Sequence, residues 1–381
     1  MYYFDQAATS LKKPKVVAEA VYHAIASETI GNPNRGGHEA SMQATRMVYQ
    51  TRVAVKKLFN ASNYHVVLTK NATESLNIAI KGLFKKGDHI ITTVLEHNAV
   101  LRPVFELKDE GVALDFVQCI KGTDFLLYEQ FECLCRDNTK AIIITHASNV
   151  TGSVVDLERI SRFCKRKKIK LIVDASQTAG IIDIDLDGLD VDVFCFTGHK
   201  SLYGPQGTGG MCIKKGIEVC PLITGGSGSG SFSRTQPKGL PESLEAGTLN
   251  THGLAGLLAG IDYVLEETVE VISKKVEFLT KTFYNSIKSI DSIQIYSDNK
   301  EMNTGIVAFN IGSYDSTEIS SILDEQYNIL IRPGIHCAPL LHRSFGTETQ
   351  GMVRFSFSAF NTIEEVKYAV QAIKMIIREL E

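Results

Sequence analysis

Short apolar runs alternate along the first two-thirds of the chain with stretches of helical periodicity. Runs such as 65–69 and 141–145 are β-branched and apolar without polar alternation, which is typical of strands covered on both faces. The strands expected in this part are 65–69, 89–94, 113–117, 141–145, 170–173, 191–196 and 210–213. Helical stretches lie between them, among them 72–84 and one that Asp156 caps. The pattern predicts an α/β fold with a doubly wound, mostly parallel sheet.

From about residue 250 the pattern changes to longer helices. We expect helices over 254–267 and 271–290, then strands near 305–310, 329–332 and 353–357, with a helix from Ser316 and a final helix. Thr362 and Glu365 have the spacing of a capping box at the start of that final helix. We therefore predict a large domain over 14–250, a small α+β domain over 251–381, and an N-terminal segment, 1–13, that packs with the small domain.

Composition narrows the possible classes of protein. The chain has 381 residues, 44% of them hydrophobic, and a net charge of −3, so no basic surface for nucleic acid is expected. No apolar run approaches the ~18 residues that a membrane span needs, and the start of the chain does not resemble a signal peptide. The eight cysteines are therefore expected to be reduced thiols in a cytoplasmic protein.

Two features resemble sites but fit ordinary structure better. The Gly/Ser-rich segment 224–232 follows no βα unit, so we interpret it as a mobile loop and not as a nucleotide fingerprint. Cys133 and Cys135 lack a matching pair of ligands at zinc spacing, so no metal site is expected.

Polar residues gather where the predicted strands end. Because ligands bind at the carboxyl ends of parallel strands, these residues should share one crevice. Singly, Asp174 could cap a helix, Asn149 could hold a turn and His97 could be a core histidine. Together they form a set: the helix start Asn71–Glu74, then His97, Asn149, Asp174, Gln177, His199 and Lys200.

This set matches the needs of pyridoxal 5′-phosphate. Its aldehyde needs a lysine amine, for which Lys200 is placed, and its ring nitrogen needs a carboxylate, for which Asp174 is placed. Its phosphate needs N–H groups at a helix start, which Ala72 and Thr73 supply. Its ring face needs a flat side chain on which to stack.

A second cluster lies in the C-terminal part, in the segment 332–339. Cys337 stands there beside a histidine and near an arginine, which favours a nucleophilic thiolate; the alternative is a small buried apolar residue. Arg354 interrupts an apolar strand and suits the capture of a substrate carboxylate, with a structural ion pair as the alternative.

At this point the chain resembles the class V, fold-type I pyridoxal-phosphate enzymes, and most closely the group II cysteine desulfurases and selenocysteine lyases. The resemblance covers nearly the whole chain. It is carried by DQAATS (5–10), NATESLNIA (71–79), LEHNAV (95–100), HASNVTG (146–152), VDASQ (173–177), TGHKSLYGP (197–205), EAGTLNT (245–251), RPGIHCAP (332–339) and VRFSFSAFNT (353–362).

The resemblance implies a role for each matching residue. Lys200 bonds the cofactor and moves protons, and Cys337 attacks the substrate sulfur, yielding alanine and a persulfide that passes to an acceptor, as in iron–sulfur cluster assembly. The remaining roles are Asp174 at the ring nitrogen, Gln177 at the phenolic oxygen, His97 stacked on the ring, Asn149 beside ring and substrate, Arg354 at the substrate carboxylate, and Ala72, Thr73, Thr197, His199 and, from the partner subunit of a homodimer, Thr248 at the phosphate.

The chain also differs from well-studied desulfurases. Ser201 is inserted after the lysine, Asn71–Glu74 stands where Gly-Thr-Thr-Glu is common, and 231–243 does not closely match their hairpin. These differences indicate a shorter branch. Selenocysteine lyase, transaminase and C–S lyase activities stay open as alternatives. A nicotinamide dehydrogenase lacks its glycine fingerprint here, and a cofactor-free binding protein would leave Lys200 unexplained.

Overall fold

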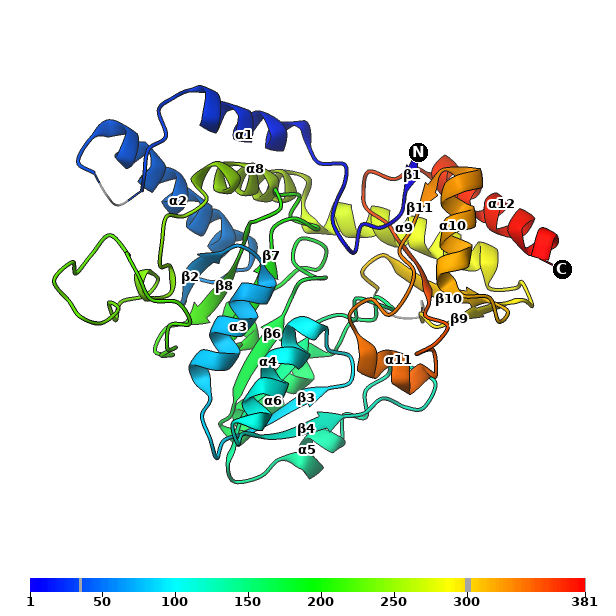
Figure 1. The fold of residues 1–381 in the computed structure, drawn as a ribbon, viewed down its shortest axis with the longest axis horizontal. Helices are drawn as coiled ribbons and strands as arrows, with labels where there is room; N and C mark the ends of the chain where they lie inside the picture. The colour runs from blue at the N-terminus through cyan, green and yellow to red at the C-terminus, as the bar shows by residue number, and fades with distance from the viewer. Residues whose placement is uncertain (34–35, 299–302, 381) are drawn as a thin grey trace.

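A seven-stranded sheet forms the centre of the larger part of the protein (Figure 1). The computed structural model describes residues 1–33, 36–298 and 303–380. The strand order is β2-β8-β7-β6-β5-β3-β4. The strands are β2 (Tyr64–Thr69), β3 (His89–Thr93), β4 (Ala113–Val117), β5 (Thr139–Thr145), β6 (Lys170–Asp174), β7 (Val193–Thr197) and β8 (Gly209–Lys214).

Most of this sheet is parallel, as predicted. Strands β4, β3, β5, β6 and β7 pair in parallel, whereas β8 pairs antiparallel with both β7 and β2. The antiparallel edge leaves the carboxyl ends of the parallel strands pointing the same way. The expected doubly wound α/β fold is confirmed.

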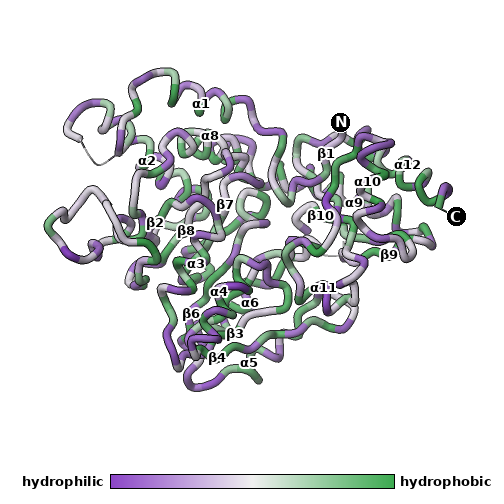
Figure 2. The backbone as a smooth tube through the Cα atoms, viewed as in Figure 1, coloured by the Kyte–Doolittle hydropathy of each residue, from purple (hydrophilic) through white to green (hydrophobic). Residues whose placement is uncertain are grey.

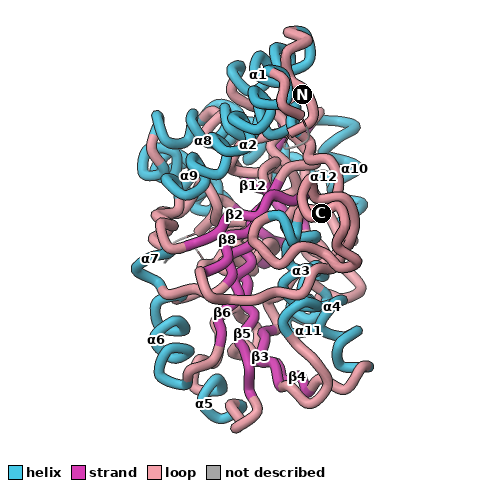
Figure 3. The backbone as a smooth tube through the Cα atoms, turned by 90° about the vertical axis from the view of Figure 1, so that its left-hand side faces the viewer, coloured by secondary structure: helices cyan, strands magenta, loops and turns pink. Residues whose placement is uncertain are grey.

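Helices cover both faces of the sheet (Figure 3). Helices α3 (Ala72–Leu83) and α4 (Asn98–Asp109) lie on one face, and α5 (Gln130–Leu134), α6 (Leu157–Lys167) and α7 (Leu186–Leu189) lie on the other. Within β5, Ile143 packs with the α3–α4 side while Ile142 and Ile144 pack with the opposite side. Burial on both faces explains the absence of polar alternation, and Figure 2 shows hydrophobic positions gathered along the interior strands.

The C-terminal part has a sheet of its own. Its strands are ordered β12-β10-β9, all antiparallel, and β1 pairs in parallel with β11. The elements are β9 (Ile293–Ile295), β10 (Ile306–Ile311), β11 (Ile329–Leu330), β12 (Val353–Ser356), α9 (Val269–Ile287), α10 (Ser316–Tyr327), α11 (Pro339–Phe345) and α12 (Ile363–Leu380), with β1 (Tyr2–Tyr3) from the N-terminal segment.

The start of the final helix confirms the predicted capping box. The Glu365 N–H donates to Thr362 Oγ1 at 3.2 Å, and the Thr362 N–H donates to Glu365 Oε2 at 3.1 Å. The segment 224–232 contains no helix or strand, and a 3₁₀ turn at Glu242–Leu244 follows it. Among the described residues, no helix combines the length and apolar character that crossing a membrane requires.

Helix α8 (Thr251–Glu267) packs against α1 (Lys15–Ala26) and α2 (Glu39–Leu58), over the loop that follows Lys200 (Figure 1). The approach is close because α8 presents glycines to that loop. A Cβ atom on Gly260 would lie 2.2 Å from the Leu202 carbonyl oxygen, and one on Gly256 would lie 2.7 Å from Pro205 of the same loop and 2.6 Å from Val21 of α1. The division of the chain into domains at residue 250 stays a prediction.

We expect Gly260→Ala to destabilise the protein by about 1–3 kcal/mol, because the added methyl group has to push apart two backbones. The measurement is urea unfolding. Gly239→Ala is the matched control, since nothing lies within 4 Å of the added Cβ at that position. Equal stabilities of the two variants would contradict the close packing of α8 on the loop.

Candidate active site

One cavity of about 180 Å³ opens at the carboxyl ends of β5, β6 and β7. The structure brings together there almost every residue that the sequence analysis selected. The lining includes Ala72, Thr73, His97, Asn149, Asp174, Gln177, Thr197, His199, Lys200 and Arg354. Cys337 and Thr248 are not among the residues that line it.

Asp174 is the last residue of β6, and its side chain is buried in the floor of the site. One carboxylate oxygen accepts hydrogen bonds from Ser176, from its N–H at 2.9 Å and its hydroxyl at 2.5 Å. These bonds fix the direction of the carboxylate. A carboxylate held in this way suits a protonated ring nitrogen.

Lys200 follows β7 in a tightly folded turn. The Tyr203 N–H donates to the Lys200 carbonyl at 2.9 Å, and the Gly204 N–H donates to Gly198 at 2.7 Å. Burial lowers the pKa of the Lys200 amine to about 8, although the nearby Asp174 acts to raise it. An amine with a lowered pKa keeps a sizeable neutral fraction near neutral pH, which bond formation with an aldehyde requires.

His97 caps helix α4. Its Nδ1 accepts a hydrogen bond from the Ala99 N–H at 3.0 Å. Burial lowers the pKa of the imidazole to about 4, so the ring is neutral and carries its proton on Nε2. The cap holds the ring at the cavity wall, while stacking of His97 on the cofactor ring stays a prediction.

The N-terminus of α3 forms a second wall. Asn71 Oδ1 caps the helix by accepting from the Glu74 N–H at 2.9 Å. The Ala72 and Thr73 N–H groups have no partner within the helix and are available to an anion. His199 adds a neutral ring, because burial lowers its pKa to about 4, and its Nδ1 lies 3.1 Å from Thr9 Oγ1.

Three buried polar atoms of residues that line this cavity have no hydrogen-bond partner among the described residues: Thr197 Oγ1, Asn149 Oδ1 and Arg354 Nε. A buried polar atom without a partner costs free energy, so each is matched to a ligand. Gln177 donates one amide hydrogen to the Ala7 carbonyl at 3.1 Å and keeps another. The helix start, the carboxylate, the amine and these atoms fit pyridoxal 5′-phosphate.

Arg354, on β12, is 1% exposed and paired within the protein. Its Nη2 lies 2.8 Å from Asp5 Oδ1, and its Nη1 donates to the Asn149 carbonyl at 2.7 Å. Its Nε has no hydrogen-bond partner in the part of the chain that the structure describes. The structural ion pair that the sequence left as an alternative is present, while binding of a substrate carboxylate stays a prediction.

Cys337 lies on the loop between β11 and α11, beside the cavity. Its Sγ is 3.8 Å from Nη2 of Arg332, and Arg332 does line the cavity. The loop is tied to the cavity wall because Asn149 Nδ2 donates to the His336 carbonyl at 2.7 Å. The thiol is half-buried, so the alternative of a fully buried apolar residue does not hold.

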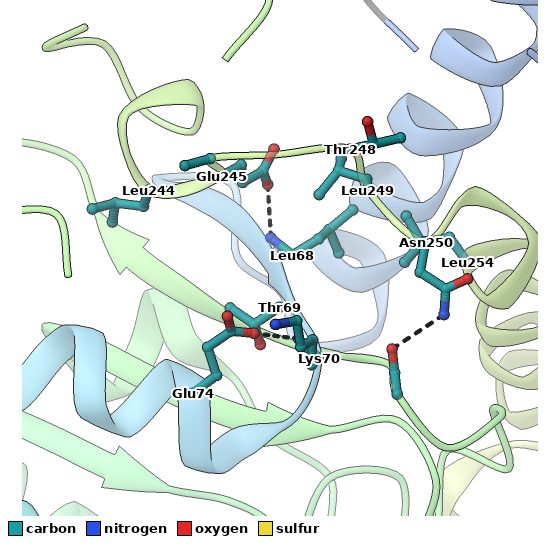
Figure 4. Close-up of a pocket in the computed structure, with 12 residues that line it drawn as sticks. Leu68, Thr69, Lys70, Glu74, Leu244, Glu245, Thr248, Leu249, Asn250 and Leu254 are labelled. Atoms are coloured by element: carbon teal, nitrogen blue, oxygen red, sulfur yellow. Dashed lines mark hydrogen bonds between the residues drawn. The ribbon is translucent and has the colours of Figure 1, made fainter. Parts of the chain in front are cut away.

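Thr248 lies in another pocket, of about 120 Å³ (Figure 4). Leu68, Lys70 and Glu245 share this pocket with it. Glu245 accepts from the Leu68 N–H at 2.8 Å and pairs with Arg52, which fixes the segment that leads to Thr248. A contact of Thr248 with the phosphate of a partner subunit stays a prediction.

Comparison with known proteins identifies the family. The class-V aminotransferase family model matches residues 2–369. The chain belongs to the class-V aminotransferase family. This family depends on pyridoxal phosphate, which confirms the predicted cofactor and the predicted resemblance.

The class-V relatives include several named for one activity. A probable cysteine desulfurase of Methanothermobacter thermautotrophicus is 33% identical, over 98% of this chain and 94% of the relative. The cysteine desulfurase IscS of Shewanella frigidimarina is 30% identical, over 99% and 93%. The apo structure of a cysteine desulfurase from Thermococcus onnurineus superimposes with a TM-score of 0.92 at 30% identity, over 99% and 95%.

Sequence reasoning missed several residues of this class-V site. Ser176 orients Asp174, Asp5 pairs with Arg354, and Ala7, Ala8 and Thr145 line the cavity. Thr145 ends β5, so the rule of strand ends could have found it. Nothing in the local pattern indicates the pairing of Asp5 with a residue almost 350 positions away.

Glu96, next to His97, is a fully buried acid beneath the site. Its Oε1 accepts from Thr93 Oγ1 at 2.6 Å and from the Thr145 N–H at 3.1 Å, whereas no described residue bonds to Oε2. Burial raises the pKa of Glu96 from 4.5 to about 8 despite these two bonds. The carboxyl group is therefore neutral at pH 7.

We expect Glu96→Gln to alter how the stability of the protein depends on pH. Between these two pKa values Glu96 is protonated in the folded protein and ionised in the unfolded chain. The stability of the wild type therefore falls as pH rises from about 4.5 to about 8. The variant lacks this loss. The difference in unfolding free energy between variant and wild type should therefore grow by about 1.4 kcal/mol per pH unit in this range. Urea unfolding across that range tests it; parallel curves would contradict a neutral Glu96.

Proposed function

We propose that the protein is a pyridoxal-phosphate-dependent cysteine desulfurase. It converts L-cysteine to L-alanine and passes the sulfur, as a persulfide of Cys337, to an acceptor. The observation that carries the proposal is the position of the thiol. Cys337 lies beside Arg332, which lines the same cavity as Lys200 and Asp174.

The bound cofactor supplies an electron sink for bonds broken at the substrate α- and β-carbons. Lys200 moves the proton at the α-carbon, and Asp174 holds the ring-nitrogen proton. The Cys337 thiolate attacks the substrate sulfur, so an S–S bond forms as the C–S bond breaks. The β-carbon then takes a proton and becomes the methyl group of alanine. Sulfur is oxidised and carbon is reduced, so no external oxidant is needed.

The remaining residues bind and orient. We propose that Arg354 takes the substrate carboxylate, because its Nε is unpaired and its pKa, although lowered by burial to about 10, leaves it charged. Asn149 Oδ1 faces ligand groups from a side chain that also fixes the Cys337 loop. His97 covers the ring, and Gln177 donates to the phenolic oxygen. Ala72, Thr73, Thr197 and His199 hold the phosphate.

The selenium analogue of this reaction is the second candidate. A selenocysteine lyase would use the same cofactor residues, and selenium leaves more readily than sulfur, so it would depend less on Cys337. A transaminase is less favoured, because it has no use for a thiol beside the substrate. The sulfur acceptor is expected to be a protein or small-molecule thiol that reaches the half-buried Cys337.

We also propose a homodimer in which Thr248 of one subunit contacts the phosphate in the other. Two facts support this. Thr248 does not line the cavity of its own subunit, and among the described residues only a weak contact of 3.4 Å with Asn32 engages its hydroxyl.

Cys337→Ala should abolish release of sulfide and alanine from L-cysteine, because no thiolate is left to accept the sulfur. Its cofactor absorbance should stay, since Cys337 does not line the cofactor cavity. Sulfide and alanine are measured with a thiol reductant present. Cys220→Ala, which removes an exposed cysteine, is the control and should behave as wild type. Sulfide production by Cys337→Ala would contradict the proposed function, and full activity on selenocysteine alone would favour the lyase.

Thr248→Ala should weaken cofactor binding about tenfold, the scale of one hydrogen bond to a charged group. In analytical ultracentrifugation the protein should have a mass twice the 41.9 kDa of one chain. Cofactor titration and analytical ultracentrifugation test the two statements together. A monomer whose affinity for the cofactor is unchanged by the substitution would rule out the shared site.

A further inference from the structure

The backbone around Cys337 is strained. His336 and Cys337 both have left-handed backbone angles, with φ of 52° and 58°. Residues with a Cβ avoid this region, at a cost of roughly 1–2 kcal/mol each. Two such residues in succession persist only where neighbouring groups hold them.

Part of the restraint comes from the cavity side. Asn149 Nδ2 donates to the His336 carbonyl at 2.7 Å, and the Asn98 N–H donates to the Cys337 carbonyl at 2.7 Å. These bonds fix the two carbonyl groups of the strained pair. The Ala338 N–H also closes the turn by donating to the Ile335 carbonyl at 3.0 Å, but none of these bonds fixes the His336 ring.

A chain of buried side chains restrains the His336 ring. His336 Nε2 lies 3.0 Å from the Arg332 carbonyl, and His336 Nδ1 lies 3.4 Å from His342 Nε2. His342 Nδ1 lies 2.8 Å from Thr347 Oγ1. Both rings are buried, at 2% and 0% exposure. His342 and Thr347 belong to α11 and its C-terminal turn, drawn in orange in Figure 1.

When both rings are neutral, these hydrogen bonds have a single possible direction. The Arg332 carbonyl can only accept, so His336 Nε2 must donate and His336 Nδ1 must accept. His342 Nε2 then donates, and His342 Nδ1 accepts from the Thr347 hydroxyl. Burial lowers the pKa of His342 to about 4 and that of His336 well below its ordinary value, which makes both rings neutral at pH 7.

We propose that Thr347, His342 and His336 form a directional hydrogen-bond relay that holds the Cys337 loop in its left-handed form and the thiol against Arg332. His342 is then a positioning residue for the reaction at Cys337, although it lies outside the cavity. The proposal rests on the proposed function in its assignment of Cys337 as the nucleophile. Its structural content, the placing of the thiol, is tested independently of turnover.

The test compares three variants of the cofactor-loaded protein. His342→Leu keeps a similar volume and removes the donor to His336, whereas His342→Gln retains an Nε2–H donor. His89→Leu is the matched control, because His89 Nδ1 makes the same kind of buried bond, 2.8 Å to Thr139 Oγ1, at the start of β3. The readouts are the rate at which iodoacetamide alkylates Cys337, kcat and KM for L-cysteine, cofactor absorbance and the unfolding midpoint.

His342→Leu should slow both Cys337 alkylation and kcat about tenfold, the scale of leaving one buried hydrogen-bonding group unpaired. The thiol leaves its position beside the Arg332 guanidinium, while cofactor absorbance and KM stay unchanged. His342→Gln should restore most of both rates. His89→Leu should lose stability only. Should His342→Leu fail to fold, Thr347→Val, which removes only the end of the relay, should slow both rates in the same direction.

The relay would be overturned if folded His342→Leu had the wild-type alkylation rate and kcat. Equal losses of both rates in His342→Gln and His342→Leu would also overturn it. Failure of the proposed function is a separate result. The proposed function fails if Cys337→Ala still releases sulfide. In that case alkylation of Cys337 in the His342 variants still tests the relay.

Discussion

Arg354 carries its charge where the side chain is 1% exposed, and a charge so placed must find its partners inside the protein. Those partners come from distant parts of the chain: the Asp5 carboxylate from the N-terminal segment and the Asn149 carbonyl from the loop after β5. Arg354 also pairs through its backbone with Arg332, at the start of the Cys337 loop. One guanidinium thus joins the two sheets and the N-terminal segment at the edge of the cavity.

The same junction explains how charge is distributed in the site. Burial keeps His97, His199, His336 and His342 neutral, and Glu96 is protonated. Asp174 lies near the Lys200 amine, and Arg354 pairs with Asp5. Neutral imidazoles can stack, accept or donate without repelling the Arg354 guanidinium, to which the proposed function assigns the substrate carboxylate.

The fold and the cavity could be predicted from the sequence because both follow from local rules. Apolar runs without alternation indicated buried parallel strands, and strand ends located Asp174, Lys200 and Asn149 in one crevice. Cross-chain pairs could not be predicted in the same way. The Asp5–Arg354 ion pair and the packing of Gly260 on Leu202 depend on tertiary contacts that no short segment encodes.

The Cys337 loop shows most clearly where local reasoning stops. The sequence drew attention to the thiol because a histidine and an arginine stand nearby. It gave no sign that His336 turns away to meet His342, or that two successive residues take left-handed angles. In the proposed reaction the thiol must first reach a substrate in the cavity and then an acceptor outside it, and its half-buried position suits both contacts. A strained loop, held from the cavity side by Asn149 and from the other by buried imidazoles, provides that position without placing the thiol in the cofactor cavity.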